Sequence, residues 1–112
     1  MTMKFRHIVL AVTAVFSVTG ASAMDAAAAK ALATKSACLS CHAADKKVVG
    51  PAYKDVAAKH KGQADAMAKV MARIKSGGVG MYGPIPMPPQ PALKDDELKL
   101  LAEWVLAGAP DK

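Results

Sequence analysis

The chain has 112 residues, with 15 Lys and Arg against 9 Asp and Glu and hence a formal charge of +6. This length allows one domain rather than two. Because 53% of the residues are hydrophobic and 21% are charged, the composition excludes a disordered chain. Two cysteines also exclude a disulfide-rich scaffold, and only 4% aromatic residues leave a small core.

The N-terminus has the parts of a secretory signal. Lys4 and Arg6 form a basic start, residues 8–18 are largely apolar, and an Ala-Ser-Ala tripeptide follows. We expect residues 1–23 to be cleaved, which leaves a mature domain of residues 24–112 with a charge of +4. The alternative is an uncleaved membrane anchor, but the apolar run is shorter than the roughly 20 residues that span a bilayer. We therefore expect an exported protein without stable membrane insertion.

An Ala-rich helix is expected over residues 26–35, with Asp25 as its N-cap. It leads into the motif Cys38-Leu39-Ser40-Cys41-His42. The spacing C-x-x-C-H is the attachment signature of a c-type haem. Cys38 and Cys41 are expected to form thioethers to the two vinyl groups, and His42 to bind the iron. One covalently attached haem c fits an exported chain, because this haem is attached outside the cytoplasm.

A redox-active dithiol and a structural zinc site are the alternatives for these cysteines. A thioredoxin-like dithiol lies beside a βαβ pattern, and the mature chain has no alternating, strand-like run. A zinc site needs four ligands, and beyond Cys38, Cys41 and His42 only His60 is left. The motif therefore favours haem.

Two helices are expected after a loop that closes on Gly50-Pro51. The first covers residues 53–59 and places His60 on its inner side at its end. The second covers about residues 64–75, with Met67 and Met71 on its apolar face as core residues. We interpret His60 as a hydrogen-bonded inner or rim histidine; the alternative is an iron ligand that competes when the following loop opens.

Met87 lies in a proline-rich stretch, Gly83-Pro84-Ile85-Pro86-Met87-Pro88-Pro89. Prolines fix φ and remove amide donors, so this stretch is expected to be stiff and non-helical. Such a loop can hold a thioether sulfur at a set distance from the iron, which makes Met87 the expected sixth ligand. A gap-filling role for Met87 and ligation by Met81, in the preceding Gly-rich turn, are the alternatives.

A last helix is expected over about residues 96–107, capped by Asp95 or Asp96, with Leu98 and Leu101 on its apolar face. The mature chain is thus predicted to be a single all-α domain of about four helices wrapped around one covalently attached haem.

Five stretches together resemble the small bacterial class I cytochromes c of the c-551/c-552 type. They follow one another in order and cover essentially all of the mature chain: 38–42, 49–57, 73–75, 83–89 and 95–106. The resemblance implies a periplasmic one-electron carrier rather than an enzyme, with His42 and Met87 on the iron. It implies transfer from a membrane quinol-oxidising complex to a nitrite reductase or cytochrome oxidase. A haem enzyme or gas sensor with an open sixth position and a haem subunit of a larger redox complex are the alternatives.

The resemblance also assigns roles around the haem. Pro51 matches the proline whose carbonyl accepts the Nδ1 proton of the haem histidine. Arg73 matches a residue that pairs with a haem propionate, although a solvated helix charge is the alternative. Trp104 matches a tryptophan that packs in the core near the haem. Tyr82, where some relatives carry Trp, is expected to hydrogen-bond a propionate.

Two further positions depart from the family pattern. His60 stands where an aromatic is common, and Gln90 stands where some relatives carry Asn near the methionine sulfur. The segment after Gln90 is also longer by one residue, so this loop is expected to join the last helix differently.

Electron transfer needs an exposed haem edge and a weak contact guided by charge. Lysines flank the haem-binding half and predict redox partners with acidic patches, although simple solvation is the alternative. Export, the haem motif and the lack of aromatic or Arg-rich interleaving argue against nucleic acid as a partner. A monomer is expected. The lysines concerned are Lys35, Lys46, Lys47, Lys54, Lys59 and Lys61.

Overall fold

The computed structural model describes residues 24–112, so the expected signal segment, residues 1–23, lies outside the described residues. Within the described range there is no β-strand, and β-type pairing is limited to two isolated bridges, His42 with Lys47 and Gly78 with Met87. The predicted all-α fold is confirmed. Its elements follow in the order α1 (Ala26–Lys35), the 3-10 turn η1 (Cys38–Ser40), α2 (Tyr53–Lys59), α3 (Ala66–Ser76) and α4 (Asp95–Leu106).

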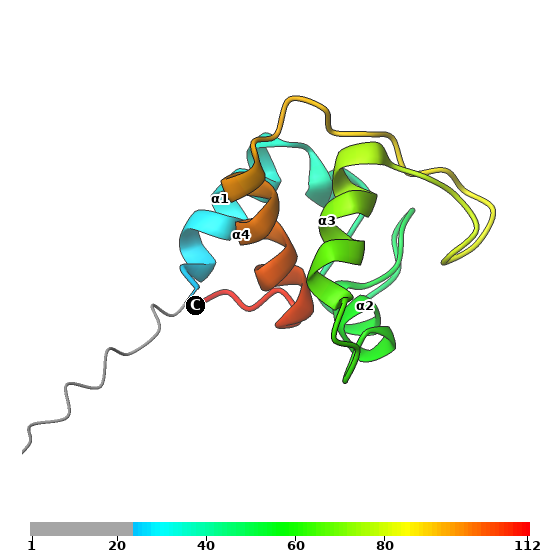
Figure 1. Ribbon diagram of the computed structural model, residues 1–112, viewed down its shortest axis with the longest axis horizontal. Helices are drawn as coiled ribbons and strands as arrows, with labels where there is room; N and C mark the ends of the chain where they lie inside the picture. The colour runs from blue at the N-terminus through cyan, green and yellow to red at the C-terminus, as the bar shows by residue number, and fades with distance from the viewer. Residues whose placement is uncertain (1–23) are drawn as a thin grey trace, which may run out of the picture.

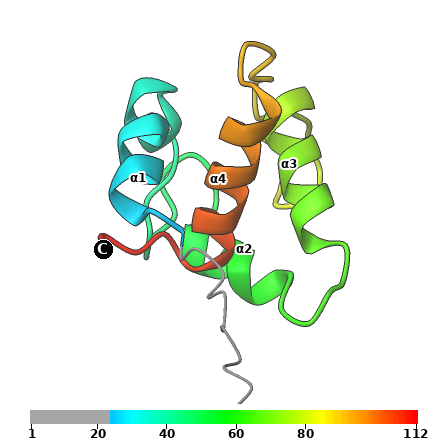
Figure 2. The same cartoon turned by 60° about the vertical axis from the view of Figure 1, so that its left-hand side comes forward.

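Helix α4 is the centre of the domain. It contacts each of the other three helices, and Figures 1 and 2 show it between α1 and α3, with α2 near its C-terminal end. Leu98 and Leu101 are each 2% exposed and Ala102 is fully buried, so the apolar face predicted for this helix forms the core. On α1, Ala29 and Ala33 are fully buried. Such small side chains allow two helices to pack closely.

Helix ends follow the local capping chemistry. The Oδ1 atom of Asp25 accepts a hydrogen bond from the backbone N–H of Ala28 at 3.0 Å, which confirms the predicted N-cap. Helix α3 begins two residues later than expected. Helix α4 begins at Asp95 with Lys94 as its N-cap, so the prediction of Asp95 or Asp96 was wrong. The carboxylate of Glu97 instead accepts the Lys94 N–H at 3.0 Å.

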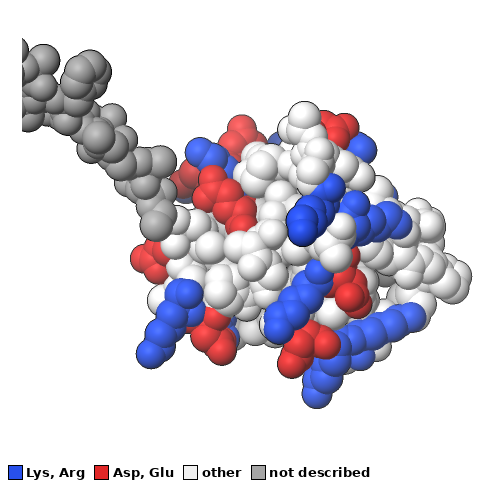
Figure 3. All heavy atoms as spheres, turned by 90° about the horizontal axis from the view of Figure 1, so that it is seen from below, with Lys and Arg blue, Asp and Glu red and all other residues white. Residues whose placement is uncertain are grey.

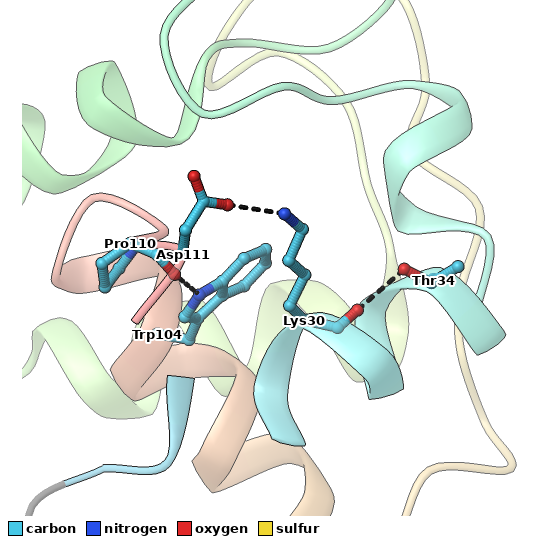
Figure 4. Close-up of polar contacts among 5 residues, drawn as sticks. All are labelled: Lys30, Thr34, Trp104, Pro110 and Asp111. Atoms are coloured by element: carbon cyan, nitrogen blue, oxygen red, sulfur yellow. Dashed lines mark hydrogen bonds and ion pairs between the residues drawn. The ribbon is translucent and has the colours of Figure 1, made fainter. Parts of the chain in front are cut away.

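The segment after α4 folds back over Trp104. The indole Nε1 donates to the carbonyl of Pro110 at 2.9 Å, and Asp111 forms an ion pair with Lys30 on α1 (Figure 4). Ala109 adopts the left-handed conformation, with φ of 55°, and its N–H bonds to the Trp104 carbonyl. This segment covers the α1–α4 junction.

The long loop of residues 77–94 joins α3 to α4 and runs around the opposite side of the domain (Figure 1). No helix within residues 24–112 has the length and apolar character needed to cross a membrane.

Candidate haem-binding site

A large cavity lies between the Cys38–His42 motif, α2, α3 and the 77–94 loop, and it encloses about 1320 Å³, part of which is open to solvent. Its lining is mostly apolar. Helix α4 contributes Leu101 and Val105 to its floor, and α3 contributes Val70 and Ile74. A cavity of this kind suits a large, flat, apolar group.

The cysteines and the histidine of the motif share one tight turn. The carbonyl of Cys38 accepts hydrogen bonds from the backbone N–H groups of Cys41, at 3.2 Å, and His42, at 3.0 Å. The turn begins at Ala37, which adopts the left-handed conformation with a φ of 60°. All three side chains line the cavity, and both thiols are free. Burial raises the pKa of the Cys38 thiol, which keeps it protonated near neutral pH.

His42 is oriented by contacts on two sides. Its Nδ1 lies 2.8 Å from the carbonyl oxygen of Pro51, an acceptor, so Nδ1 carries the proton and Nε2 keeps its lone pair. This is the contact that the resemblance implies for Pro51. The ring of Tyr53 stacks on the imidazole, with centroids 4.9 Å apart and planes 17° apart. Gly50 is required here because a Cβ atom would collide with the His42 ring. The chain therefore presents a metal-binding nitrogen to the cavity.

Met87 is held on the loop that forms the facing wall. Its N–H donates to the Gly78 carbonyl at 2.8 Å, and its carbonyl accepts from Gly78 N–H at 3.0 Å. These two bonds pin the proline-rich stretch against the end of α3, and Gly77 allows this approach because a Cβ there would strike the Met87 carbonyl. Met87 is half-buried and lines the cavity, as does its rival Met81.

The two methionines on α3 take no part in the cavity wall. Met67 and Met71 are partly buried against the core, which agrees with the packing role predicted for them.

Arg73 lies in the last turn of α3, half-buried, and lines the cavity. Its guanidinium packs over Gly78, where any Cβ would overlap it. Gln90 was expected beside Met87, but its side-chain Nε2 donates to the Ser36 carbonyl at 3.3 Å. Gln90 therefore joins the loop to the end of α1, while still lining the cavity.

Tyr82 and His60 form a pair that the sequence analysis did not identify. The Tyr82 hydroxyl, expected on a haem propionate, lies 3.1 Å from Nε2 of His60. The other ring nitrogen of His60 lies 3.0 Å from Oε1 of Gln63, so the prediction of a hydrogen-bonded inner histidine is confirmed. Burial raises the pKa of the Tyr82 hydroxyl, and the charge of nearby Arg73 opposes this shift. The only sequence signal for the pair was that both positions depart from the family pattern.

Trp104 lies behind the cavity rather than on its wall. It is 2% exposed and meets Tyr53 edge to face, with ring centroids 5.4 Å apart. Tyr53 in turn stacks on His42, so Trp104 supports the histidine through one intervening ring.

These features define a small all-α protein built around an apolar cavity, whose lining includes two cysteines, a histidine and two methionines. The family model described as cytochrome c matches residues 26–109. The chain therefore belongs to the cytochrome c family.

Individual relatives show which cytochromes c this chain is similar to. Cytochrome c-551 of Pseudomonas aeruginosa is 61% identical over 70 residues, which are 62% of this chain and just under two thirds, 66%, of that protein. Cytochrome c-551 of Stutzerimonas stutzeri is 48% identical over 91 residues, which are 79% of this chain and 86% of that protein. The fold agrees with the crystal structure of wild-type Nitrosomonas europaea cytochrome c552, at a TM-score of 0.67 and 45% identity over 70% of this chain and 96% of that one.

The structure of the class 1 cytochrome MtoD from Sideroxydans lithotrophicus ES-1 also matches, at a TM-score of 0.68 and 34% identity over 79% of this chain and 100% of that one. The chain is thus a small class I c-type cytochrome, an electron carrier rather than an enzyme, with one covalently attached haem c. The two cysteines that it offers for attachment are Cys38 and Cys41.

Proposed function

We propose that the mature domain is a periplasmic one-electron shuttle whose haem iron is bound by His42 on one side and Met87 on the other. The observation that carries the proposal is the 2.8 Å contact between His42 Nδ1 and the Pro51 carbonyl. It fixes the tautomer that leaves Nε2 available for iron, on the same turn as both attachment cysteines. The haem, when bound, supplies the ferrous–ferric couple.

The Met87 loop supports the second ligand. Residues 83–89 contain four prolines, and Met87 forms two backbone hydrogen bonds with Gly78. Both features restrict the motion of this stretch, so we expect the thioether to stay in place in both redox states. A rigid ligand lowers the rearrangement that accompanies a change of charge, which suits rapid electron transfer. Methionine opposite histidine also raises the haem potential.

Other cavity residues are proposed to set the haem environment. Arg73, half-buried at the cavity wall, offers its guanidinium to a haem propionate. Pro51 holds His42, and Trp104 backs Tyr53. Tyr82 lines the cavity with its hydroxyl turned to His60, so its part in the haem environment is indirect.

The donor is proposed to be a membrane quinol-oxidising complex, and the acceptor a nitrite reductase or cytochrome oxidase. Weak, charge-guided contacts suit such a carrier. The flanking lysines are exposed, yet Figure 3 shows acidic side chains interspersed with basic ones on the face viewed from below. We therefore propose that docking depends on Lys47, which lines the cavity, and on Lys59, which donates to the carbonyl of the lining residue Met81, more than on a continuous basic field.

We also propose that residues 1–23 are the export signal that directs the chain to the periplasm. The mature domain is proposed to be a monomer. N-terminal sequencing of the protein purified from a periplasmic extract tests the cleavage after Ala23.

Absorption spectra of the purified holoprotein test the ligation. We expect a low-spin c-type spectrum, a weak red methionine-to-ferric band and no reaction with carbon monoxide. Met87→Ala should lose that band and bind carbon monoxide, whereas the matched variant Met81→Ala should keep the wild-type spectrum. A wild-type protein that is high-spin or binds carbon monoxide readily would favour a haem enzyme or sensor. Loss of the band in Met81→Ala alone would move the ligand to Met81.

A further inference from the structure

His60 is a titratable side chain buried at the wall of the haem cavity. It caps the C-terminal end of α2, is 6% exposed, and lines the cavity together with Tyr82. Among residues 24–112, Tyr53 is the only other titratable side chain buried to this degree. Electron transfer through His42 and Met87 assigns no role to His60.

The neighbours of His60 define which nitrogen carries the proton. The side-chain Nε2 of Gln63 donates to the Lys59 carbonyl at 3.3 Å, and Nζ of Lys69 lies 3.5 Å from Gln63 Oε1. Both contacts fix the amide oxygen of Gln63 toward His60 Nδ1, at 3.0 Å. Nδ1 therefore carries the proton in the neutral ring, and Nε2 accepts from the Tyr82 hydroxyl.

The same contacts also accommodate a second proton. A proton added to Nε2 of His60 can donate to the Tyr82 oxygen, because a hydroxyl both donates and accepts. The Tyr82 O–H group then rotates so that its hydrogen points away from His60. Neither protonation state leaves a ring nitrogen buried without a partner, so both states are compatible with the packed fold.

The charges that surround this pair are mostly basic. On α2, Lys59 lies 4.6 Å above the Tyr82 ring and donates to the Met81 carbonyl. On α3, Arg73 acts on Tyr82, and Lys69 near Gln63 is paired with Asp65 at 3.2 Å. Helix α4 contributes apolar side chains to the same wall, and the exposed Lys61 follows His60 in the chain. In this setting the binding of one more proton is sensitive to any further change of charge in the cavity.

We propose that His60 is a proton-binding site whose charge is coupled to that of the haem, with the Tyr82 hydroxyl as its hydrogen-bond partner on the cavity wall. The inference rests on the proposed function, because it needs the haem in this cavity. When one electron arrives from the donor protein, the cavity loses one positive charge and His60 binds a proton from solvent more tightly. When the electron leaves for the acceptor protein, the proton returns to solvent. Reduction is thus accompanied by partial uptake of a proton and oxidation by its release, and each event favours the other.

The sign of the effect follows from this coupling. The reduced state holds the proton more tightly, so the reduction potential is higher at low pH and falls as the pH rises through the titration of His60. Histidine is the side chain that changes charge between about pH 5 and 8. A roughly threefold difference in proton affinity between the two redox states corresponds to a total fall of about 28 mV, at about 59 mV per tenfold.

The test measures the reduction potential of the holoprotein from pH 5 to 9, together with NMR titration of the His60 ring proton in the ferric and ferrous states. In the wild type we expect one step in the potential and a higher NMR midpoint in the ferrous state. His60→Phe should remove the step. Gln63→Glu should move it to higher pH, because a carboxylate stabilises the imidazolium, and Tyr82→Phe should move it to lower pH. Lys61→Gln, a charge removed beside His60 at an exposed position, should leave the height of the step unchanged.

Two results would overturn the inference. One is an unchanged step in His60→Phe, which would assign it to another group such as a haem carboxylate. The other is the same NMR midpoint in both redox states. If His60→Phe does not mature, the wild-type NMR titration and Gln63→Glu decide the question. Failure of the proposed ligation is distinguishable, because it would show as carbon monoxide binding in the wild type.

Discussion

The two sides of this domain are held together differently. On the first side, which comprises α1, α4 and the C-terminal segment, polypeptide packs on polypeptide: Ala29, Ala33 and Ala102 are fully buried and Trp104 is 2% exposed. On the cavity side, which comprises η1, α2, α3 and the 77–94 loop, one wall is a long loop with large apolar side chains at its surface, among them Val79 at 57% exposed. The chain thus completes one side of its core by itself, and leaves the other to the haem.

This difference explains why the backbone positions that need glycine lie on the cavity side. Gly50 and Gly77 are required where a Cβ would strike the His42 ring or the Met87 carbonyl, and Gly78 adopts a φ of 143° that favours glycine. These positions shape a space for a ligand. The packed side relies instead on small and apolar side chains that many sequences could supply.

The largest expected effect comes from withholding the haem. A chain with both Cys38→Ser and Cys41→Ser, which cannot form the thioethers, should lose cooperative thermal unfolding by circular dichroism. A domain this small has little core to spare, and the apolar side chains that line the cavity would lose their partner atoms. The holoprotein measured in the same buffer is the control. A cooperative transition in the variant would show that the packed side folds on its own and would end the proposed dependence on haem.

Trp104→Ala should have the next largest effect, on the packed side. Truncating a buried tryptophan costs about 3–5 kcal/mol, and it also leaves the Pro110 carbonyl without its donor. Denaturant unfolding of the holoprotein measures the loss, with Trp104→Phe as the milder matched variant. The methionine-to-ferric band should persist, because Tyr53 separates Trp104 from His42. Loss of that band in Trp104→Phe would show that the two sides are not separable.

The sequence predicted most of the packed side. Helix α1 has the bounds expected from Asp25, and on the cavity side α2 has those expected from the apolar spacing around Tyr53, because capping and periodicity are local signals. The cap of α4 was missed because the Glu97 carboxylate accepts the backbone N–H of Lys94, a contact that does not depend on the type of residue at position 94.

On the cavity side, local signals located the residues but not their partners. The motif, Met87 and Pro51 all line the cavity, yet Tyr82 bonds to His60, which is 22 positions away in the chain, and Gln90 bonds to Ser36, which is 54 positions away. The path of the 77–94 loop decides which of several donors and acceptors meet. The sequence shows which side chains can form hydrogen bonds, whereas the tertiary fold determines which of them meet.

The smallest effect is expected at the rim of the packed side, where Asp111 meets Lys30 (Figure 4). The hydrogen bond and charge of Lys30 lower the pKa of the Asp111 carboxyl, so folding favours its ionised form. The stabilisation is therefore present above the unfolded pKa of an ordinary aspartate and is lost as the pH falls through the folded value.

Because Asp111 is fully exposed, solvent screens most of its attraction to Lys30. Asp111→Asn should lower Tm slightly at pH 7 and at low salt, and should match the wild type once the pH is low enough to protonate Asp111 in the folded protein, or in 1 M salt. Asp45→Asn, an exposed aspartate without an ion pair in the described residues, is the control. A large, salt-independent loss in Asp111→Asn would mean that the C-terminal segment is held through this pair, and not through the indole bond to Pro110.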